Sequence, residues 1–199
     1  TAKKRGFTAR PVVGAVFLPL LYDHAVWKKW ASRDKTKASG WAPIPPPPKI
    51  TNVVPAADKA PAIWRYTTEK PANDWAKPSF DDSAWKEGKS GFGTQDTPSA
   101  HIGTVWNTAD IWLRREVEIP ADKLKNLEFW IHHDEDAEVY INGVQAARLR
   151  GYATDYFNRA LSGPGLAALK PGKNLISIHC HQTGGGQYID LGFVAVGSN

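Results

Sequence analysis

The sequence predicts a mainly β fold, a β-sandwich of jelly-roll type that follows an N-terminal helical segment and a proline-rich linker. Short runs of alternating apolar and polar residues recur from position 51 onward, separated by clusters of Pro, Gly, Asn and Asp. The chain has 199 residues, of which 42% are hydrophobic, enough for one sandwich-sized core and a smaller extra segment. Nine Trp and six Tyr suit strand faces, and also flat carbohydrate-binding surfaces.

Residues 1–33 have a helical pattern. Apolar side chains between Pro11 and Arg33 recur near helical spacing, and Pro19 within this pattern predicts a kink or two short helices. A segment of this kind would expose a wide apolar stripe if it stood alone. We therefore expect an upstream catalytic domain or another protein chain to cover residues 11–31.

Residues 34–50 are expected to form a linker. They contain four consecutive prolines, Pro45–Pro48, which favour the semi-rigid polyproline II conformation. We assign residues 51–199 to the sandwich. The sequence contains no Met, even at position 1, which indicates a processed product or a fragment of something longer.

Eight strands are expected within the sandwich. The alternation is strictest in Leu175–His181, and Asn142-Gly143 is the strongest short signal for a tight hairpin turn. Asp155–Leu161 is instead helix-like. The expected strands are Ile63–Thr68, Gly91–Gly93, Ile111–Ile119, Leu127–His133, Ala137–Ile141, Val144–Arg150, Asn174–His181 and Tyr188–Val196.

Charge and cysteine content narrow the classes of function. The formal net charge is +5, but the positive residues form no basic stripe interleaved with aromatics, which argues against nucleic-acid binding. The single cysteine, Cys180, cannot form an intrachain disulfide and is expected to be a buried thiol. No signal peptide and no apolar run of membrane-spanning length are recognisable.

Several motifs between residues 63 and 196 occur in the order found in one fold family. They are Phe80–Trp85 (FDDSAW) preceded by Trp75, then Ile111–Arg115 (IWLRR), Val139–Val144 (VYINGV) and Pro171–Ile176 (PGKNLI). Together they resemble the galactose-binding-like β-sandwich, as in the sugar-binding domain of glycoside hydrolase family 2. The resemblance implies the sandwich but no particular ligand, because many such domains are purely structural.

A second resemblance concerns the N-terminal segment. Ala9–Phe17 and Val26–Ala31 resemble the C-terminal end of the glutaminase-A-like family, whose members carry an (α/α) toroid similar to six-hairpin glycosidases. The resemblance departs where Pro19 interrupts the helix. It implies that residues 1–33 end a catalytic domain whose active-site carboxylates lie upstream of this sequence. It also implies a secreted, periplasmic or cell-surface hydrolase as the parent protein.

The densest group of polar side chains is His132–Asp136, at a bend between two expected strands. Clustered carboxylates suit the hydroxyls of a sugar, and they also suit a hard cation such as Ca²⁺. Asp134 and Asp136 are therefore candidate sugar ligands and candidate calcium ligands, with His133 in the same site. A solvated acidic corner is the remaining interpretation.

Two polar-aromatic loops are expected to complete a sugar site, because aromatic rings stack on sugar faces while carboxylates and amides bind the hydroxyls. If the module binds sugar, at least two rings among Trp130 and the loop tyrosines should be exposed. If it is purely structural, those rings should be buried or lie in an interface. The candidate residues in the loops are Tyr152, Asp155, Tyr156, Gln187 and Tyr188.

A pair of histidines gives a weaker metal hypothesis. His179 and His181 share one face of an expected strand, and with His132 or His133 they have a spacing that zinc can use. No cysteine pair or helix-borne H-E-x-x-H motif supports zinc. The alternative is a sheet-face pair close to Asp134.

These observations predict a non-catalytic accessory module, carbohydrate-binding, of a larger secreted hydrolase of glutaminase-like or glycosidase-like type. One alternative is a structural or interaction domain that docks on its parent or on another chain without binding sugar. The other is a hydrolase in its own right, which requires two carboxylates in one pocket, one with a raised pKa. We assign no catalytic residue within this chain.

Overall fold

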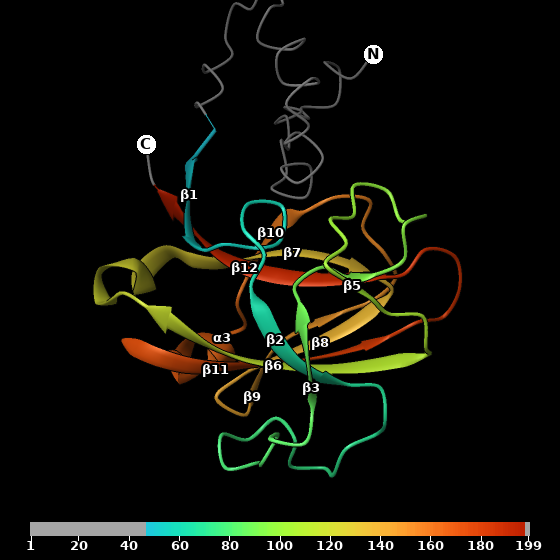
Figure 1. Ribbon diagram of the computed structural model, residues 1–199. Helices are drawn as coiled ribbons and strands as arrows, with labels where there is room; N and C mark the ends of the chain where they lie inside the picture. The colour runs from blue at the N-terminus through green and yellow to red at the C-terminus, as the bar shows by residue number, and fades with distance from the viewer. Residues whose placement is uncertain (1–46, 198–199) are drawn as a thin grey trace, which may run out of the picture. The chain divides into compact units, whose positions relative to one another are not determined.

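The computed structural model describes residues 47–197, which form two stacked β-sheets (Figure 1). This confirms the predicted sandwich. The predicted helical segment, residues 1–33, and most of the predicted linker lie outside the described residues. The domain boundaries stay a prediction, although the first strand already begins at Lys49.

One sheet has the strand order β10-β7-β12-β4-β5, and β1 also pairs with β12. All its pairs are antiparallel except β4 with β5. We call it the β12 sheet; it is the upper layer in Figure 1. Its strands are β1 (Lys49–Val54), β4 (Phe92–Gly93), β5 (Thr104–Val105), β7 (Leu127–Asp134), β10 (Phe157–Ala160) and β12 (Tyr188–Gly197).

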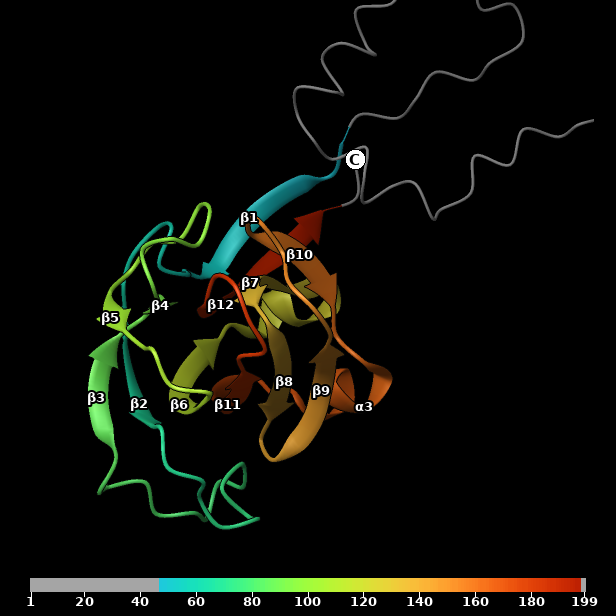
Figure 2. The ribbon, with the colours of Figure 1, turned by 90° about the vertical axis from the view of Figure 1, so that its right-hand side faces the viewer.

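The other sheet has the order β3-β2-β6-β11-β8-β9, and every pair in it is antiparallel. We call it the β11 sheet; it forms the lower layer (Figure 1), and Figure 2 shows the same arrangement from the side. Its strands are β2 (Ile63–Thr67), β3 (Lys86–Lys89), β6 (Asp110–Ile119), β8 (Asp136–Ile141), β9 (Val144–Leu149) and β11 (Gly172–His181).

The core lies between the two sheets and follows the period-two pattern of the sequence. On β12, Leu191 and Phe193 point inward, and on β11, Ile176 and Ile178 do the same; all four are almost fully buried. Burying side chains of this size stabilises the fold by about 1.5–3 kcal/mol each. Cys180 belongs to the same core, as predicted.

The predicted hairpin turn joins β8 to β9. Asn142 and Gly143 have φ angles of 50° and 86°, and two consecutive positive φ angles are what a type I′ turn requires. The Asn142 side chain adds support, because its Oδ1 accepts a hydrogen bond from the Leu175 backbone at 2.9 Å and its Nδ2 donates to Asn174 at 2.9 Å. The turn is thereby tied to β11.

Helices are few among residues 47–197. They are the 3₁₀ helix η3 (Ala121–Asn126) and the short helix α3 (Gly163–Ala168), whose N-terminus is capped by the Ser162 side chain. The prediction of a helix at Asp155–Leu161 was wrong, because Phe157–Ala160 forms the edge strand β10 and pairs with β7. None of the helices in this part of the chain is long and apolar enough to cross a membrane.

Several residues of the motifs that resemble the galactose-binding-like family bind one another in the structure. Arg114 is 3% exposed, and its Nε donates to Asp82 Oδ2 at 2.7 Å. Its other nitrogens donate to the backbone carbonyls of Trp75, Lys77 at 3.0 Å and Phe80 at 3.3 Å. One buried guanidinium therefore holds the whole 75–82 loop against the outer face of the β11 sheet.

Candidate functional site

The acidic corner lies where β7 ends and β8 begins, as predicted. His133 is 4% exposed, and its Nδ1 lies 2.6 Å from the Glu135 carbonyl, so this nitrogen must carry the proton and donate. Its ring packs edge-on against Phe157. Burial lowers the pKa of His133 despite this hydrogen bond, and the lowered pKa favours the neutral imidazole at neutral pH.

Asp134 is the carboxylate of this corner whose pKa is raised. Its pKa is raised to about 6, first because burial disfavours the charge and then because Glu135 and Asp96 bring negative charge close. The glycine-rich loop passes directly over it, since a Cβ placed on Gly186 would lie 2.5 Å from Asp134 Oδ2. The backbone of Asp134 also forms a β-bridge with Tyr152. Asp134 therefore lies beneath two converging loops.

Asp136 has the opposite environment. Its Oδ1 accepts a hydrogen bond from the Gly151 backbone at 2.7 Å, and its Oδ2 pairs with the Arg150 guanidinium. The Gly151 and Arg150 bonds lower the pKa of Asp136. The carboxylate is thus already occupied by donors of the protein itself.

The described residues contain no set of ligands for the predicted metal sites. Across residues 47–197, no group of three or more His, Cys, Asp or Glu side chains is placed to hold a metal ion. Glu135 and Asp96 lie close to Asp134, but they and Asp136, the other predicted calcium ligand, do not form such a group. The calcium assignment stays a prediction.

The aromatic rings of the predicted sugar site are divided between surface and interior. Tyr152 is 68% exposed, whereas Tyr156 and Tyr188 are 8% and 0% exposed. Trp130 is half-buried and stacks on Tyr156, with ring centroids 6.0 Å apart. Only Tyr152 therefore offers an open ring to a ligand, one fewer than the sugar-binding hypothesis requires.

The two buried tyrosines belong to a polar network on the outer face of the β12 sheet. The Tyr156 hydroxyl donates to Asp190 Oδ2 at 2.7 Å and lies 2.7 Å from the Tyr188 hydroxyl. Asp190, which is 2% exposed, also accepts from the Ala57 backbone at 2.6 Å. Burial raises the pKa of Asp190 and of both tyrosines. This network was not predicted, although the i, i+2 spacing of Tyr188 and Asp190 on one strand face was its visible signal.

The remaining predicted ligands also serve the framework. Gln187 is 7% exposed, and its side-chain nitrogen donates to the Thr108 carbonyl at 2.7 Å. Asp155 is exposed, and its Oδ1 accepts from the backbone of Tyr156 at 2.7 Å. The corner that stays open to solvent is therefore built around Tyr152, with Asp134 beneath it.

The histidine pair has a different carboxylate partner from the expected one. His179 Nε2 and His181 Nδ1 lie 2.7 Å and 2.9 Å from the same oxygen of Asp110, so each must donate a proton to it. His179 also stacks on Trp112 with centroids 4.6 Å apart. Burial acts to raise the pKa of Asp110, but the two imidazole hydrogen bonds outweigh it and lower that pKa. Asp134 is not their partner.

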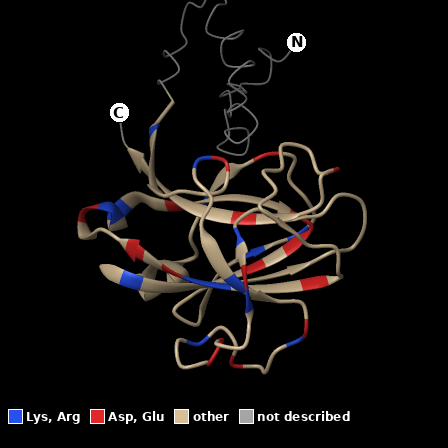
Figure 3. Cartoon of the chain, in the orientation of Figure 1, with Lys and Arg blue, Asp and Glu red and all other residues tan. Residues whose placement is uncertain are grey.

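The outer face around this pair is electrically balanced. Glu138 pairs with Arg148 at 3.3 Å, and the Asp136 pair with Arg150 lies on the neighbouring strands. Positions of Lys or Arg and positions of Asp or Glu both occur in the two sheets (Figure 3). A face whose carboxylates are already paired offers little free charge to a ligand.

Comparison with known proteins gives one sequence likeness. No family model matches the chain. An alpha-L-rhamnosidase from Streptomyces avermitilis is 27% identical over 122 residues, which cover 59% of this chain and 12% of that protein. The likeness is therefore to a small part of the relative, and the chain spans about an eighth of its length.

Solved structures give likenesses of the fold. A glycosyl hydrolase family 2 member from Bacteroides cellulosilyticus has a TM-score of 0.46 at 19% identity, covering 66% of this chain and 20% of that one. A beta-glycosidase from Bacteroides vulgatus has a TM-score of 0.46 at 19% identity, with coverages of 73% and 20%. At TM-scores below 0.5 these likenesses support no statement about function.

Proposed function

We propose that the sandwich is a non-catalytic accessory module of a larger glycosidase-type hydrolase. The observation that carries this is the state of two carboxylates, one in the predicted site and one in the tyrosine network beside it. Asp136 is paired with Arg150, and Asp190 is buried under two tyrosines. Glycoside hydrolysis needs two carboxyl groups that face one bond across an accessible site.

The sequence likeness supports the same proposal. A module similar to a small part of an alpha-L-rhamnosidase fits an accessory position in a longer chain. The resemblance of residues 1–33 to a glutaminase-A-like family leaves the catalytic class of the parent as either glycosidase-like or glutaminase-like. A secreted, periplasmic or cell-surface location, as the sequence predicts, would place such a module beside polysaccharide.

Turnover assays on the full chain test the non-catalytic assignment. We expect no release of nitrophenol from p-nitrophenyl α-L-rhamnoside, and no difference between the wild type and Asp134→Asn. Asp134 is the informative position, because its pKa of about 6 is of the kind that a general acid needs. Turnover that Asp134→Asn abolishes would overturn the proposal.

A second candidate function is glycan binding at the open corner. Tyr152 is 68% exposed and is joined by a β-bridge to Asp134, and Thr183 from the glycine-rich loop donates to Glu135 at 2.8 Å. An exposed ring beside carboxylates is the pattern that a sugar-binding surface uses. The corner is thus the place where the predicted carbohydrate role can still reside.

Calorimetric titration of the full chain tests this second candidate. L-rhamnose, D-galactose and plant cell-wall oligosaccharides would be titrated with and without EDTA. If a single exposed ring is enough for a sugar site, Tyr152→Ala should abolish the binding, and Ile63→Ala, a change at another exposed apolar side chain, should leave it intact. Absence of heat at millimolar sugar, or equal binding by the two variants, would exclude the corner as a sugar site.

A further inference from the structure

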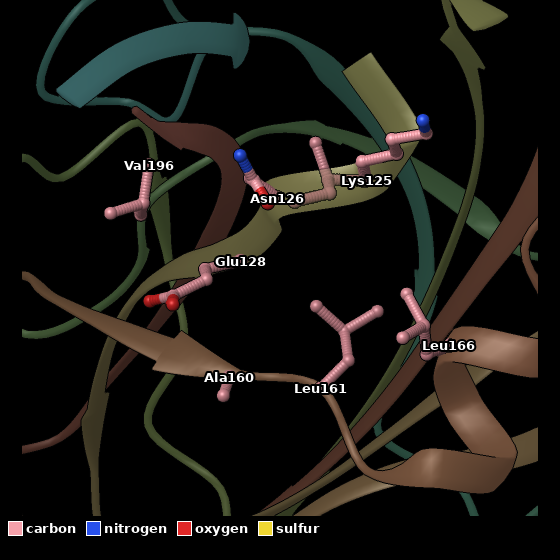
Figure 4. A pocket seen from close by; sticks show the side chains of 8 residues that line it. Lys125, Asn126, Glu128, Ala160, Leu161, Leu166 and Val196 are labelled. Carbon is pink, nitrogen blue, oxygen red and sulfur yellow. The ribbon is translucent and has the colours of Figure 1, made fainter. Parts of the chain in front are cut away.

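Two adjacent cavities lie at the end of β7 opposite the acidic corner. Their volumes are about 250 Å³ and about 240 Å³. Both are lined by Lys125, Asn126 and Val196, so they form two halves of one groove beside the C-terminal end of η3 (Figure 4). Each half has room for one large side chain.

The first half of the groove is lined by apolar and polar side chains in similar measure. Leu161 and Leu166 lie side by side along it, and the Glu128 side chain lies between Ala160 and Val196 (Figure 4). The Glu128 carboxylate accepts a hydrogen bond from Asn158 Nδ2 at 2.6 Å. Leu166 is 46% exposed, although large apolar side chains are mostly buried in this module. An exposed leucine on the rim of a cavity is typical of a surface that binds an apolar group.

The second half of the groove is basic. Lys49, Lys123 and Lys125 line it, and Asp122 is its only carboxylate. Asp122 pairs with Lys123 at 2.9 Å. No carboxylate among residues 47–197 forms an ion pair with Lys49 or Lys125. Within the described part of the chain, Lys49 and Lys125 therefore keep their positive charge without an ion-pair partner beside the two leucines.

We propose that this groove binds an extended peptide segment of a partner protein, with an apolar side chain in the first half and an Asp or Glu in the second. The lysines complement the carboxylate, and Leu161 and Leu166 bury the apolar anchor. This inference rests on the proposed accessory function, because a module that docks on its parent or on another chain needs such a recognition surface. It commits to a protein partner rather than to a glycan or a lipid.

Fluorescence anisotropy on the full chain tests the groove. The probe is a fluorescein-labelled heptapeptide with two Leu-Asp pairs separated by Gly, and its counterparts carry Lys for Asp or Ser for Leu. We expect saturable binding of the probe, weakened about tenfold or more in either counterpart. Lys125→Glu and Leu166→Ser should weaken probe binding to the same degree. The matched controls, Lys86→Glu and Ile63→Ser, change exposed residues elsewhere and should not.

Three outcomes would overturn the inference. One is that binding does not saturate at about 1 mM probe, because a dissociation constant above that value is too weak for a docking contact. Another is equal binding of the Lys-for-Asp counterpart. The third is binding of oligosaccharide or lipid vesicles that Leu166→Ser abolishes while the peptides do not bind. None of these results affects the turnover assay, and Tyr152→Ala should leave probe binding unchanged, so the two proposals fail separately.

Discussion

At the scale of single residues, Asp134 and Asp136 show how two carboxylates in one corner acquire opposite titration. They are two positions apart in the sequence, yet burial and negative neighbours raise the pKa of Asp134 while Gly151 and Arg150 lower that of Asp136. The difference comes from the burial of Asp134 beside Glu135 and from the donors of Asp136, Arg150 and Gly151, which lie 14 and 15 positions along the chain. The two opposite pKa shifts therefore determine how the free energy of unfolding should depend on pH.

Asp134 should make the fold more stable at mild acid than at neutral pH. Its folded pKa of about 6 lies above the ordinary value of 3.8, so the folded state holds its proton over a range in which the unfolded state has lost it. Stability should fall as pH rises from about 4 to about 6 and then stay lower, by about 1–3 kcal/mol. Asp134→Asn should remove this slope and stabilise the protein at pH 7, as measured by urea unfolding at several pH values.

The matched control is Asp74→Asn, which changes an exposed carboxylate. It should leave the slope between pH 4 and pH 6 in place. An unchanged slope in Asp134→Asn would show that another group dominates the pH dependence in this range.

Arg114 should be among the most sensitive single residues. Its guanidinium bonds Asp82 and three backbone carbonyls, all of which lose their donor in Arg114→Ala. Breaking a buried charged pair costs about 3–5 kcal/mol, against about 0–1 kcal/mol for an exposed pair. Arg65 is a 38% exposed partner of the same aspartate. Chemical denaturation should therefore show a loss of unfolding free energy in the higher range for Arg114→Ala and in the lower range for Arg65→Ala. Equal losses would mean that the 75–82 loop is not held by Arg114.

At the scale of elements, the β8–β9 hairpin depends on one backbone conformation. Gly143 has a φ of 86°, and a Cβ there would lie 3.4 Å from Lys77. Gly143→Ala should therefore cost about 1–2 kcal/mol, because L-residues rarely adopt this conformation. Gly184→Ala is the control, since its Cβ meets nothing within 4 Å and its φ lies outside the positive range. Thermal unfolding of the two variants measures the difference, and equal midpoints would contradict it.

At the scale of the whole molecule, local pattern predicted the strands but not their partners. Period-two alternation identified the long strands, and Asn-Gly identified the hairpin, because both signals depend on adjacent residues. The edge strand β10 was missed because its pairing with β7, and not its own sequence, makes it a strand. The contacts of the site differ from the predicted ones for the same reason. His179 binds Asp110, which lies 69 positions away in the sequence, and no local pattern indicates such a contact.

The same dependence on distant contacts predicts that the two sheets unfold together. Phe193 of β12 is fully buried in the core cluster that also contains Ile178 of β11. Phe193→Ala should cost about 3–5 kcal/mol, because it removes a large ring and leaves a cavity between the layers. If the core is one cooperative unit, hydrogen exchange of the slowest amides in β6 and β11 should accelerate as much as in β7 and β12. Ile63→Ala, at an exposed side chain, should change neither set. Acceleration confined to β7 and β12 would mean that the two sheets open independently. The amides of the β11 sheet would then stay protected from exchange although the Phe193 ring is gone from the shared core.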